Sequence, residues 1–239
     1  MSSKECDNFE NVAPMERPFV LTTSVCQYKI MQYRSENGRI RAGNTVRRER
    51  NKTMVLYVNA CVRKESRTER IAGSLLRHLD VDLEEVRLSA LNLQPLSEER
   101  LIKRTELIER RDYSDPMFRL ARQFQQADEI VIAAPYWDLS FPAILKMYLE
   151  NIYVTGLVSE YTETGEPRGL CRAKKLWYVT TAGGPYLPDY SYAYLRTMVQ
   201  DYFAIGETEL IAAEMLDVQG FDAESIVENK IKEIDTRFR

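Results

Sequence analysis

The chain has 239 residues, of which 44% are hydrophobic and 29% charged, and this length suits one domain with a sizeable core, or a domain with a tail. Its 33 basic and 36 acidic residues nearly cancel, which argues against wholesale binding to nucleic acid. The only histidine, His78, excludes a Cys₂His₂ zinc site and any metal centre built from several histidines, so we predict no metal.

The cysteines and the apolar runs indicate the compartment. The four cysteines never have CxxC spacing, and the chain shows neither a secreted disulfide pattern nor a signal peptide. Every apolar run is far shorter than the 18 or more residues that a membrane span needs. We therefore expect a cytoplasmic protein without a membrane partner. If it is an enzyme, its chemistry comes from a cofactor.

Residues 1–53 differ from the rest of the chain in charge. They carry 10 basic and 6 acidic residues and show no sustained periodicity. We expect a basic, disordered leader over 1–53, followed by one folded domain over 54–239. Two alternatives stay open: an arm that binds nucleic acid or a membrane, or a native chain that begins at Met54 and lacks the leader.

From Met54 onward, segments typical of strands alternate with segments typical of helices. Short apolar or alternating runs predict strands at 54–60, 85–88, 129–134, 175–180 and 208–215. Apolar spacing and helix-starting residues predict helices at 66–79, 97–111, from Ser114 onward with Ser114 as N-cap, and at 142–154, 190–205 and 223–236. A hairpin-like excursion rich in turn residues interrupts the alternation at 160–169.

This order of elements predicts an α/β fold. Strands that alternate with helices form a parallel sheet that is covered on both faces. With five strands, the leading architecture is the flavodoxin-like three-layer α/β/α sandwich. Ligands of such sheets bind outside the carboxyl ends of the strands. The loops to inspect are therefore 60–68, 135–141 and 181–190.

The first of these loops combines hydroxyl and guanidinium groups with the start of a helix. Ser66, Arg67 and Thr68 lie where free backbone N–H groups favour an anion such as a phosphate. Ser66 and Glu69 also form a capping box, so the loop is equally explained by helix capping without a ligand. A Walker A sequence is absent, which argues against nucleotide hydrolysis.

The other two loops offer groups that could hold a planar ring. Tyr136 and Trp137 follow a core strand, although Trp137 and Phe141 could simply pack beneath their loop. Gly183 and Gly184 follow another core strand, where glycine permits close approach of the backbone to a ligand, although most such pairs are turns. The three loops together favour a ligand site more strongly than any one of them.

These motifs, in this order and spacing, resemble a known family. The runs 55–61 (VLYVNAC) and 66–68 (SRT), then 133–142 (AAPYWDLSFP) with Leu145-Lys146, then 161–165 (YTETG) and 180–184 (TTAGG), look like those of the flavodoxin-like NAD(P)H:quinone oxidoreductases and FMN-dependent azoreductases. The resemblance covers roughly residues 54–220. The leader lies outside it.

The resemblance implies an enzyme with bound FMN that takes hydride from NAD(P)H and passes it, by a ping-pong mechanism, to a quinone, an azo compound or a similar acceptor. It also implies a homodimer with active sites at the subunit interface. By position, the cofactor-binding residues are Cys61, Ser66, Arg67 and Thr68 around the phosphate, Tyr136, Trp137, Asp138 and Leu139 along the ribityl chain and ring edge, and Thr181, Ala182, Gly183 and Gly184 at the ring.

Catalytic residues are less well defined, because the reactivity would reside on the flavin. Tyr161 and Tyr186 are candidates for walls of the acceptor pocket, and no proton donor is assigned. His78 lies beyond the first turns of its helix, so we expect a surface role for it. Two other functions stay open: a flavodoxin-like electron carrier or partner protein without steady-state NAD(P)H turnover, and an interaction domain without a ligand.

Overall fold

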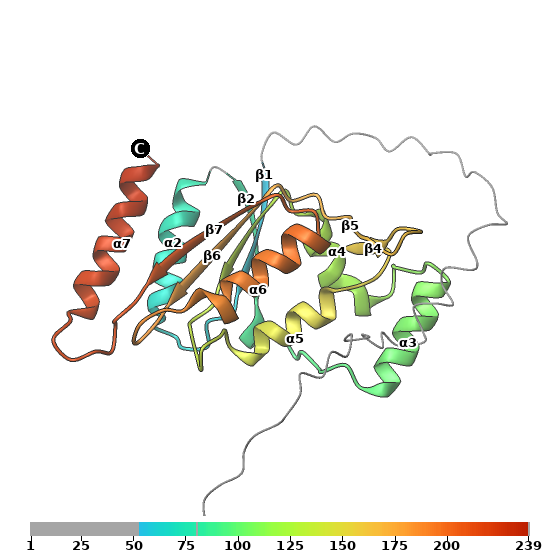
Figure 1. Ribbon diagram of the computed structural model, residues 1–239, viewed down its shortest axis with the longest axis horizontal. Coiled ribbons are helices and arrows are strands. Elements are labelled where there is room, and N and C mark those ends of the chain that lie inside the picture. The colour runs from blue at the N-terminus through green and yellow to red at the C-terminus, as the bar shows by residue number, and fades with distance from the viewer. Residues whose placement is uncertain (1–52, 80, 239) are drawn as a thin grey trace, which may run out of the picture. The chain divides into compact units, whose positions relative to one another are not determined.

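The computed structural model of the protein describes residues 53–79 and 81–238 (Figure 1). The predicted leader over 1–53 therefore lies outside the described residues, except for Thr53. Within the described part of the chain, no helix is long and apolar enough to cross a membrane.

Five parallel strands form the central sheet in the order β2-β1-β3-β6-β7. The predicted flavodoxin-like three-layer sandwich with five parallel strands is confirmed. The strands are β1 (Thr53–Asn59), β2 (Val81–Arg87), β3 (Glu129–Ala133), β6 (Lys175–Thr181) and β7 (Glu207–Ala213). The predicted excursion at 160–169 is a separate antiparallel hairpin of β4 (Ser159–Tyr161) and β5 (Pro167–Gly169).

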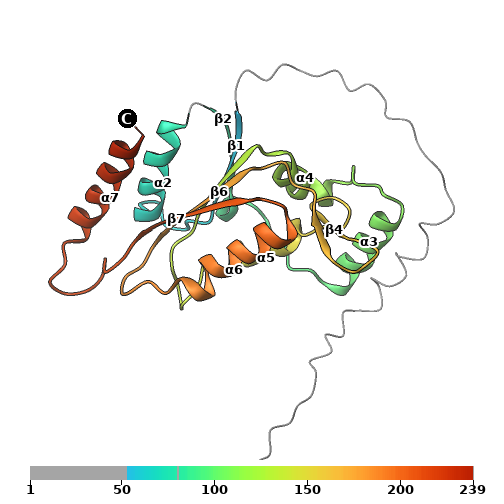
Figure 2. The same cartoon turned by 45° about the horizontal axis from the view of Figure 1, so that its top comes forward.

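Helices cover both faces of the sheet (Figures 1 and 2). One layer contains α2 (Arg67–His78) and α7 (Ala223–Arg237), which lie side by side in both views. The other layer contains α4 (Arg119–Gln126), α5 (Ala143–Ile152) and α6 (Tyr192–Thr197). Helix α3 (Glu98–Glu109) docks on the end of α5, where Arg104 donates to the Glu150 carbonyl at 3.1 Å.

The alternation of side chains along the strands divides the core in two. In β1, Leu56 and Val58 join the core beneath α4, α5 and α6, whereas Val55 and Tyr57 join the core beneath α2 and α7. All four are buried. This burial on both faces explains why the central strands appear in the sequence as continuous apolar runs.

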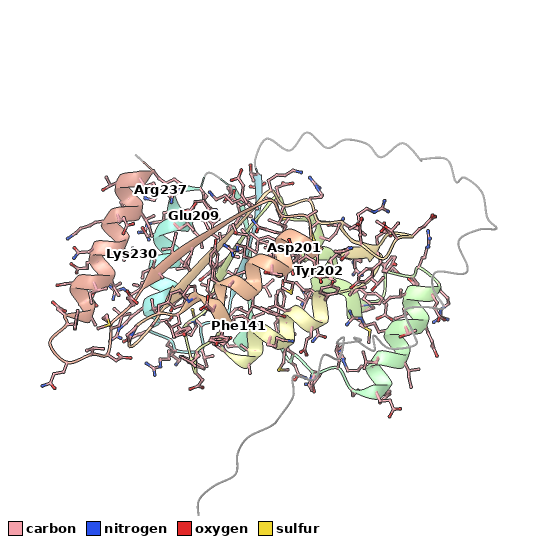
Figure 3. The ribbon with its side chains drawn as sticks, in the orientation of Figure 1. Phe141, Asp201, Tyr202, Glu209, Lys230 and Arg237 are labelled. Atoms are coloured by element: carbon pink, nitrogen blue, oxygen red, sulfur yellow. The ribbon has the colours of Figure 1, made fainter. Side chains whose placement is uncertain are left out.

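Ion pairs fasten α7 to the edge of the sheet. Arg237 near the end of α7 pairs with Glu209 of β7, and Lys175 of β6 binds the same carboxylate at 2.9 Å (Figure 3). Desolvation by burial is the largest influence on the pKa of Glu209, but the two cations outweigh it, so this pKa lies below its usual value. The carboxylate therefore stays ionised between two strands and a helix.

Three predicted boundaries were wrong. Strand β2 begins at Val81 instead of 85, because this edge strand exposes most of its side chains and shows little apolar pattern. The helical turn that follows α3, Pro116–Phe118, has Asp115 as its N-cap instead of Ser114. The Asp115 carboxylate accepts from the Met117 amide at 2.8 Å. Asp115 precedes a proline and so adopts an extended conformation, which suits an N-cap. The helical stretch predicted to reach 205 ends in a π-helical turn, Met198–Tyr202.

The topology fixes where a ligand can bind. Strand β1 lies between β2 and β3, so the chain leaves β1 on one side of the sheet and later returns on the other. Such a switch point opens a crevice outside the carboxyl ends of the two diverging strands. The loops that follow β1, β3 and β6 all lie at this edge.

Candidate cofactor site

Ser66 caps α2, as the capping hypothesis predicts. Its Oγ accepts a hydrogen bond from the Glu69 amide at 3.2 Å. The Glu69 carboxylate pairs with Arg87 and does not close the capping box, and this partner lowers the pKa of Glu69. Because a hydroxyl accepts and donates at once, Ser66 can cap the helix and still donate its proton to an anion. The amides of Arg67 and Thr68, in the first turn, have no acceptor within the helix.

The side chains of Arg67 and Thr68 point to different parts of the molecule. The Arg67 guanidinium pairs with Asp217 at 2.8 Å and donates to the Leu216 carbonyl at 3.3 Å, in the connection between β7 and α7. The Thr68 hydroxyl is buried and lies 2.6 Å from the Thr181 hydroxyl. Thr68 therefore joins the first loop to the third, while Arg67 offers the site its backbone amide.

Cys61 lies at the switch point itself. Its amide donates to Asn59 Oδ1 at 2.9 Å, and its thiol donates to the carbonyl of Ala133, at the end of β3, at 3.8 Å. Burial raises the pKa of the thiol to about 11, so the group is neutral at physiological pH. A neutral thiol is compatible with a phosphate nearby, whereas a thiolate would repel it.

The second loop is a tight turn with an unusual backbone. Trp137 and Ser140 exchange two backbone hydrogen bonds of 2.8 Å, and Asp138 and Leu139 between them have φ angles of 49° and 67°. Positive φ at both central positions is typical of a type I′ turn, and it costs on the order of 1–3 kcal/mol for residues other than glycine. The site thus contains a strained turn whose shape is set before any ligand binds.

The alternative that Trp137 and Phe141 simply pack beneath this loop is correct for Phe141 only. Phe141 is buried at the start of α5 (Figure 3), as that explanation predicts. Trp137 is 40% exposed and Leu139 is 55% exposed, so these side chains are free to contact a ligand or a partner.

Tyr136 connects the second and third loops. Its amide donates to the Thr181 carbonyl at 2.9 Å, and its ring packs edge-on against Tyr186, with centroids 4.9 Å apart. Tyr186 is fixed in turn, because its hydroxyl lies 2.9 Å from Ser191 Oγ and its amide donates to Glu214 at 2.7 Å. Burial raises the pKa of Tyr186. The Tyr136 hydroxyl is buried and has no partner among the described residues.

The Gly-Gly loop presents free donors. The amides of Gly183 and Gly184 have no acceptor within the described part of the chain, while their carbonyls accept from Asp217 and Met215 at 2.8 and 3.1 Å. A Cβ atom added at Gly184 would meet no atom within 4 Å. Ala182 is buried, and its amide donates to Ala213 at 2.9 Å. The backbone amides of residues 215–217 therefore hold the loop in place, a support that no sequence motif indicates.

Tyr161 and His78 lie apart from these three loops. Tyr161 is on β4, opposite Pro167, and no contact among the described residues joins it to the loops. His78 Nε2 lies 2.7 Å from Asp235 Oδ1, and the imidazole stacks on Phe238. His78 ends α2 and contacts α7 at a partly exposed position away from the candidate site, where it helps to hold the two helices together.

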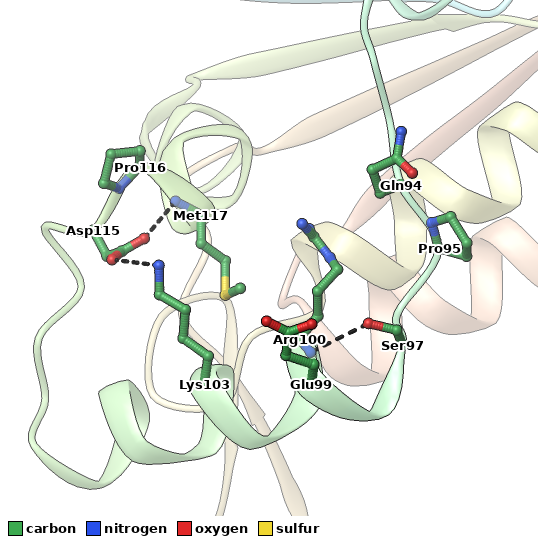
Figure 4. Close-up of a pocket in the computed structure, with 9 residues that line it drawn as sticks. All are labelled: Gln94, Pro95, Ser97, Glu99, Arg100, Lys103, Asp115, Pro116 and Met117. Atoms are coloured by element: carbon green, nitrogen blue, oxygen red, sulfur yellow. Dashed lines mark hydrogen bonds and ion pairs between the residues drawn. The ribbon is translucent and has the colours of Figure 1, made fainter.

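A cavity lined by described residues is found away from the three loops. It lies between the start of α3 and the turn at Pro116 and Met117, where Lys103 pairs with Asp115 at 3.1 Å (Figure 4). The described residues contain no group of three or more His, Cys, Asp or Glu side chains that could hold a metal ion.

The family model described as flavodoxin-like fold matches residues 53–238. The chain belongs to this family. An FMN-dependent NADH:quinone oxidoreductase from Coprothermobacter proteolyticus is 36% identical over 198 residues, which cover 76% of this chain and 96% of the relative. The enzyme of the same name from Clostridium perfringens strain ATCC 13124 is 34% identical over 190 residues, which cover 74% and 94%.

Solved structures of the flavodoxin-like fold agree with the architecture. An FMN-dependent NADH-azoreductase from Bacillus anthracis, in complex with FMN, superposes with a TM-score of 0.65 at 22% identity over 78% of this chain and 97% of its own. An NAD(P)H:quinone oxidoreductase from Methanothermobacter marburgensis gives a TM-score of 0.60 at 17% identity over 79% and 98%. At these identities the likeness concerns the fold.

Proposed function

We propose that the protein is an FMN-dependent NAD(P)H oxidoreductase that reduces quinones, azo compounds or similar acceptors by ping-pong hydride transfer. One observation carries this proposal. The first turn of α2, the strained turn after β3 and the free amides after β6 converge on one edge of the sheet, at its switch point. The similarity to NADH:quinone oxidoreductases over nearly their whole length supports the same activity.

The donors present fit the phosphate end of FMN. We propose that the hydroxyls of Ser66 and Thr68 and the amides of Arg67 and Thr68 hold the phosphate, with Cys61 behind them. The positive end of the α2 dipole adds to this binding. The Arg67 guanidinium is already paired with Asp217, so it stabilises the loop from outside.

The remaining loops fit the ring end of FMN. We propose that Tyr136, Trp137, Asp138 and Leu139 line the ribityl chain and ring edge, while Thr181, Ala182, Gly183 and Gly184 lie along the ring. Free amides at Gly183 and Gly184 match the polar atoms of an isoalloxazine, and the space beside Gly184 leaves room for it. Bound FMN supplies the hydride chemistry, and the loops bind and orient it.

A visible spectrum of the purified full-length protein tests the function. We expect the protein to be yellow, and anaerobic NADH or NADPH should bleach the flavin absorbance, which a quinone then restores. Colourless protein that binds no added FMN would contradict the proposal. Bound flavin with negligible steady-state oxidation of either nucleotide would indicate an electron carrier instead.

We further propose a homodimer of cytoplasmic subunits whose flavin-binding domain spans 54–239. Exposed apolar side chains surround the candidate site, namely Trp137, Leu139, Leu187, Tyr190 and Tyr194. They are neighbours across loops, because Ser140 Oγ donates to the Tyr190 carbonyl at 2.8 Å and the Phe141 and Tyr194 rings are 5.9 Å apart. A second subunit would cover this patch. The two described cysteines are free thiols, which suits a reducing compartment.

The raised pKa of Cys61 predicts an unreactive thiol. With a pKa of about 11, only about one molecule in a thousand carries the thiolate at pH 8, so alkylation should be more than a hundredfold slower than for a free cysteine. Iodoacetamide labelling, followed by mass spectrometry of the Cys61 peptide, measures this rate. Labelling in urea is the control and should proceed at an ordinary rate. Equal rates in folded and unfolded protein would show that the thiol is not buried.

A further inference from the structure

The hydrogen bond between Thr68 and Thr181 carries an inference that rests on the proposed function and extends it. We propose that Thr181 is a positioning residue for the FMN phosphate. Its hydroxyl donates to Thr68 Oγ1 and thereby leaves the Thr68 proton free to donate to the phosphate. The backbone of Thr181 stays at the ring end of the site, where its carbonyl accepts from the Tyr136 amide, whereas its side chain meets Thr68 and has this separate role at the phosphate.

The geometry of the pair supports a fixed, directed contact. The two hydroxyl oxygens are 2.6 Å apart, and Thr68 and Thr181 are only 1% and 9% exposed, respectively. Burial keeps solvent from competing for either hydroxyl. The contact joins α2 and β6 across 113 positions of the sequence.

The fold places both side chains on the same side of the sheet. Alternate residues of β6, Trp177 and Val179, face the layer of α2 and α7, and Thr181 continues that row. Thr68 begins the buried face of α2, which continues through Ile71 and Leu75. The threonine hydroxyls therefore meet at the end of the interface between α2 and β6.

The direction of the hydrogen bond follows from the protons and lone pairs that the two threonine hydroxyls offer. Each hydroxyl has one proton and two lone pairs. If Thr68 donated to Thr181, no Thr68 proton would remain for an anion. If Thr181 donates, Thr68 can donate onward, and a chain of two hydrogen bonds points toward the anion and strengthens both members. A phosphate at the positive end of α2 selects this second arrangement.

The neighbouring threonine provides a matched control. Thr180 is fully buried on the opposite face of β6, the face of Tyr178, so its hydroxyl does not face Thr68. Loss of that hydroxyl leaves the hydrogen bond between Thr68 and Thr181 in place. Thr180→Val and Thr181→Val therefore differ only in which side of the sheet loses a hydroxyl.

Titration of the FMN-free full-length protein with FMN and with riboflavin tests the proposal, because riboflavin has the same ring and lacks the phosphate. Thr181→Val should weaken FMN binding about tenfold, the effect of one hydrogen bond in a chain to a charged group, and leave riboflavin binding unchanged. Thr181→Ser should restore FMN binding. Thr180→Val should leave the ratio of the two affinities as in the wild type.

Thr68→Val provides a second measurement should Thr181→Val fold poorly. It should lower the affinity for FMN relative to that for riboflavin about tenfold or more. The double variant should be no weaker than Thr68→Val, since both residues act through one proton. Equal weakening of FMN and riboflavin, or no weakening, in Thr181→Val would overturn the positioning role while leaving the proposed function intact. A wild-type protein that binds neither flavin would overturn both.

Discussion

Replacing Gly169 with alanine should destabilise the fold more than any other glycine-to-alanine change in the described part of the chain. Gly169 ends β5 and packs directly on the backbone that follows the π-helical turn. A Cβ atom there would lie 2.1 Å from Phe203 C and from Ala204 N. Backbone atoms cannot rotate away as a side chain can, so the hairpin or the turn must move. We expect a loss of about 3 kcal/mol and a Tm lower by roughly 6–12 °C.

Gly206→Ala is the matched control for this substitution. Gly206 lies only three positions beyond Phe203, has no neighbour within 4 Å of an added Cβ, and does not need a positive φ. Thermal unfolding followed by circular dichroism should show a Tm close to that of the wild type for this variant. Equal Tm values for the two variants would show that β5 does not pack against Phe203 in solution.

The sequence predicts the central strands well because burial dominates them. Strands β1, β3 and β6 lie inside the sheet with helices on both faces, so nearly every position must be apolar. Strand β2 is at the edge and exposes Leu83, so its apolar pattern begins too late to indicate the true start. An edge strand depends on backbone pairing with its one neighbour, and a sequence pattern does not record that pairing.

The candidate site could be located from the sequence but not fully described. Motifs identify which loops follow core strands, and topology brings those loops to one edge. The directions of individual side chains depend on distant partners. Arg67 was expected beside a phosphate, yet its guanidinium pairs with Asp217, 150 positions away. Residues 215–217 support the Gly-Gly loop through backbone hydrogen bonds, which leave no motif.

Strand parity alone does not assign the role of Thr181. Thr180 and Thr181 are adjacent in a strand, so only one of them can face α2. The apolar pattern of β6 does not show which, because both faces are buried. The register between β6 and the first turn of α2 decides the matter, and it depends on the packing of the whole layer.

Replacing Gly184 with phenylalanine should give the largest loss of flavin binding among single changes that leave the fold intact. An added Cβ at this position meets nothing within 4 Å, so the apo protein should tolerate a large side chain, with a Tm within about 2 °C of the wild type. The same space is where we place the isoalloxazine. A benzyl group there should exclude the ring and weaken FMN binding on the order of 100-fold or more.

Gly206→Phe separates this effect from the addition of an aromatic ring as such. Gly206 also has open space around it, but it precedes β7 and so lies at the edge of the sheet opposite the candidate site. The Gly206→Phe variant should therefore bind FMN as the wild type does. Riboflavin binding should fall with FMN binding in Gly184→Phe, since the ring and not the phosphate is blocked, which is the reverse of the pattern expected for Thr181→Val. Unchanged FMN affinity in Gly184→Phe would move the ring away from the Gly-Gly loop.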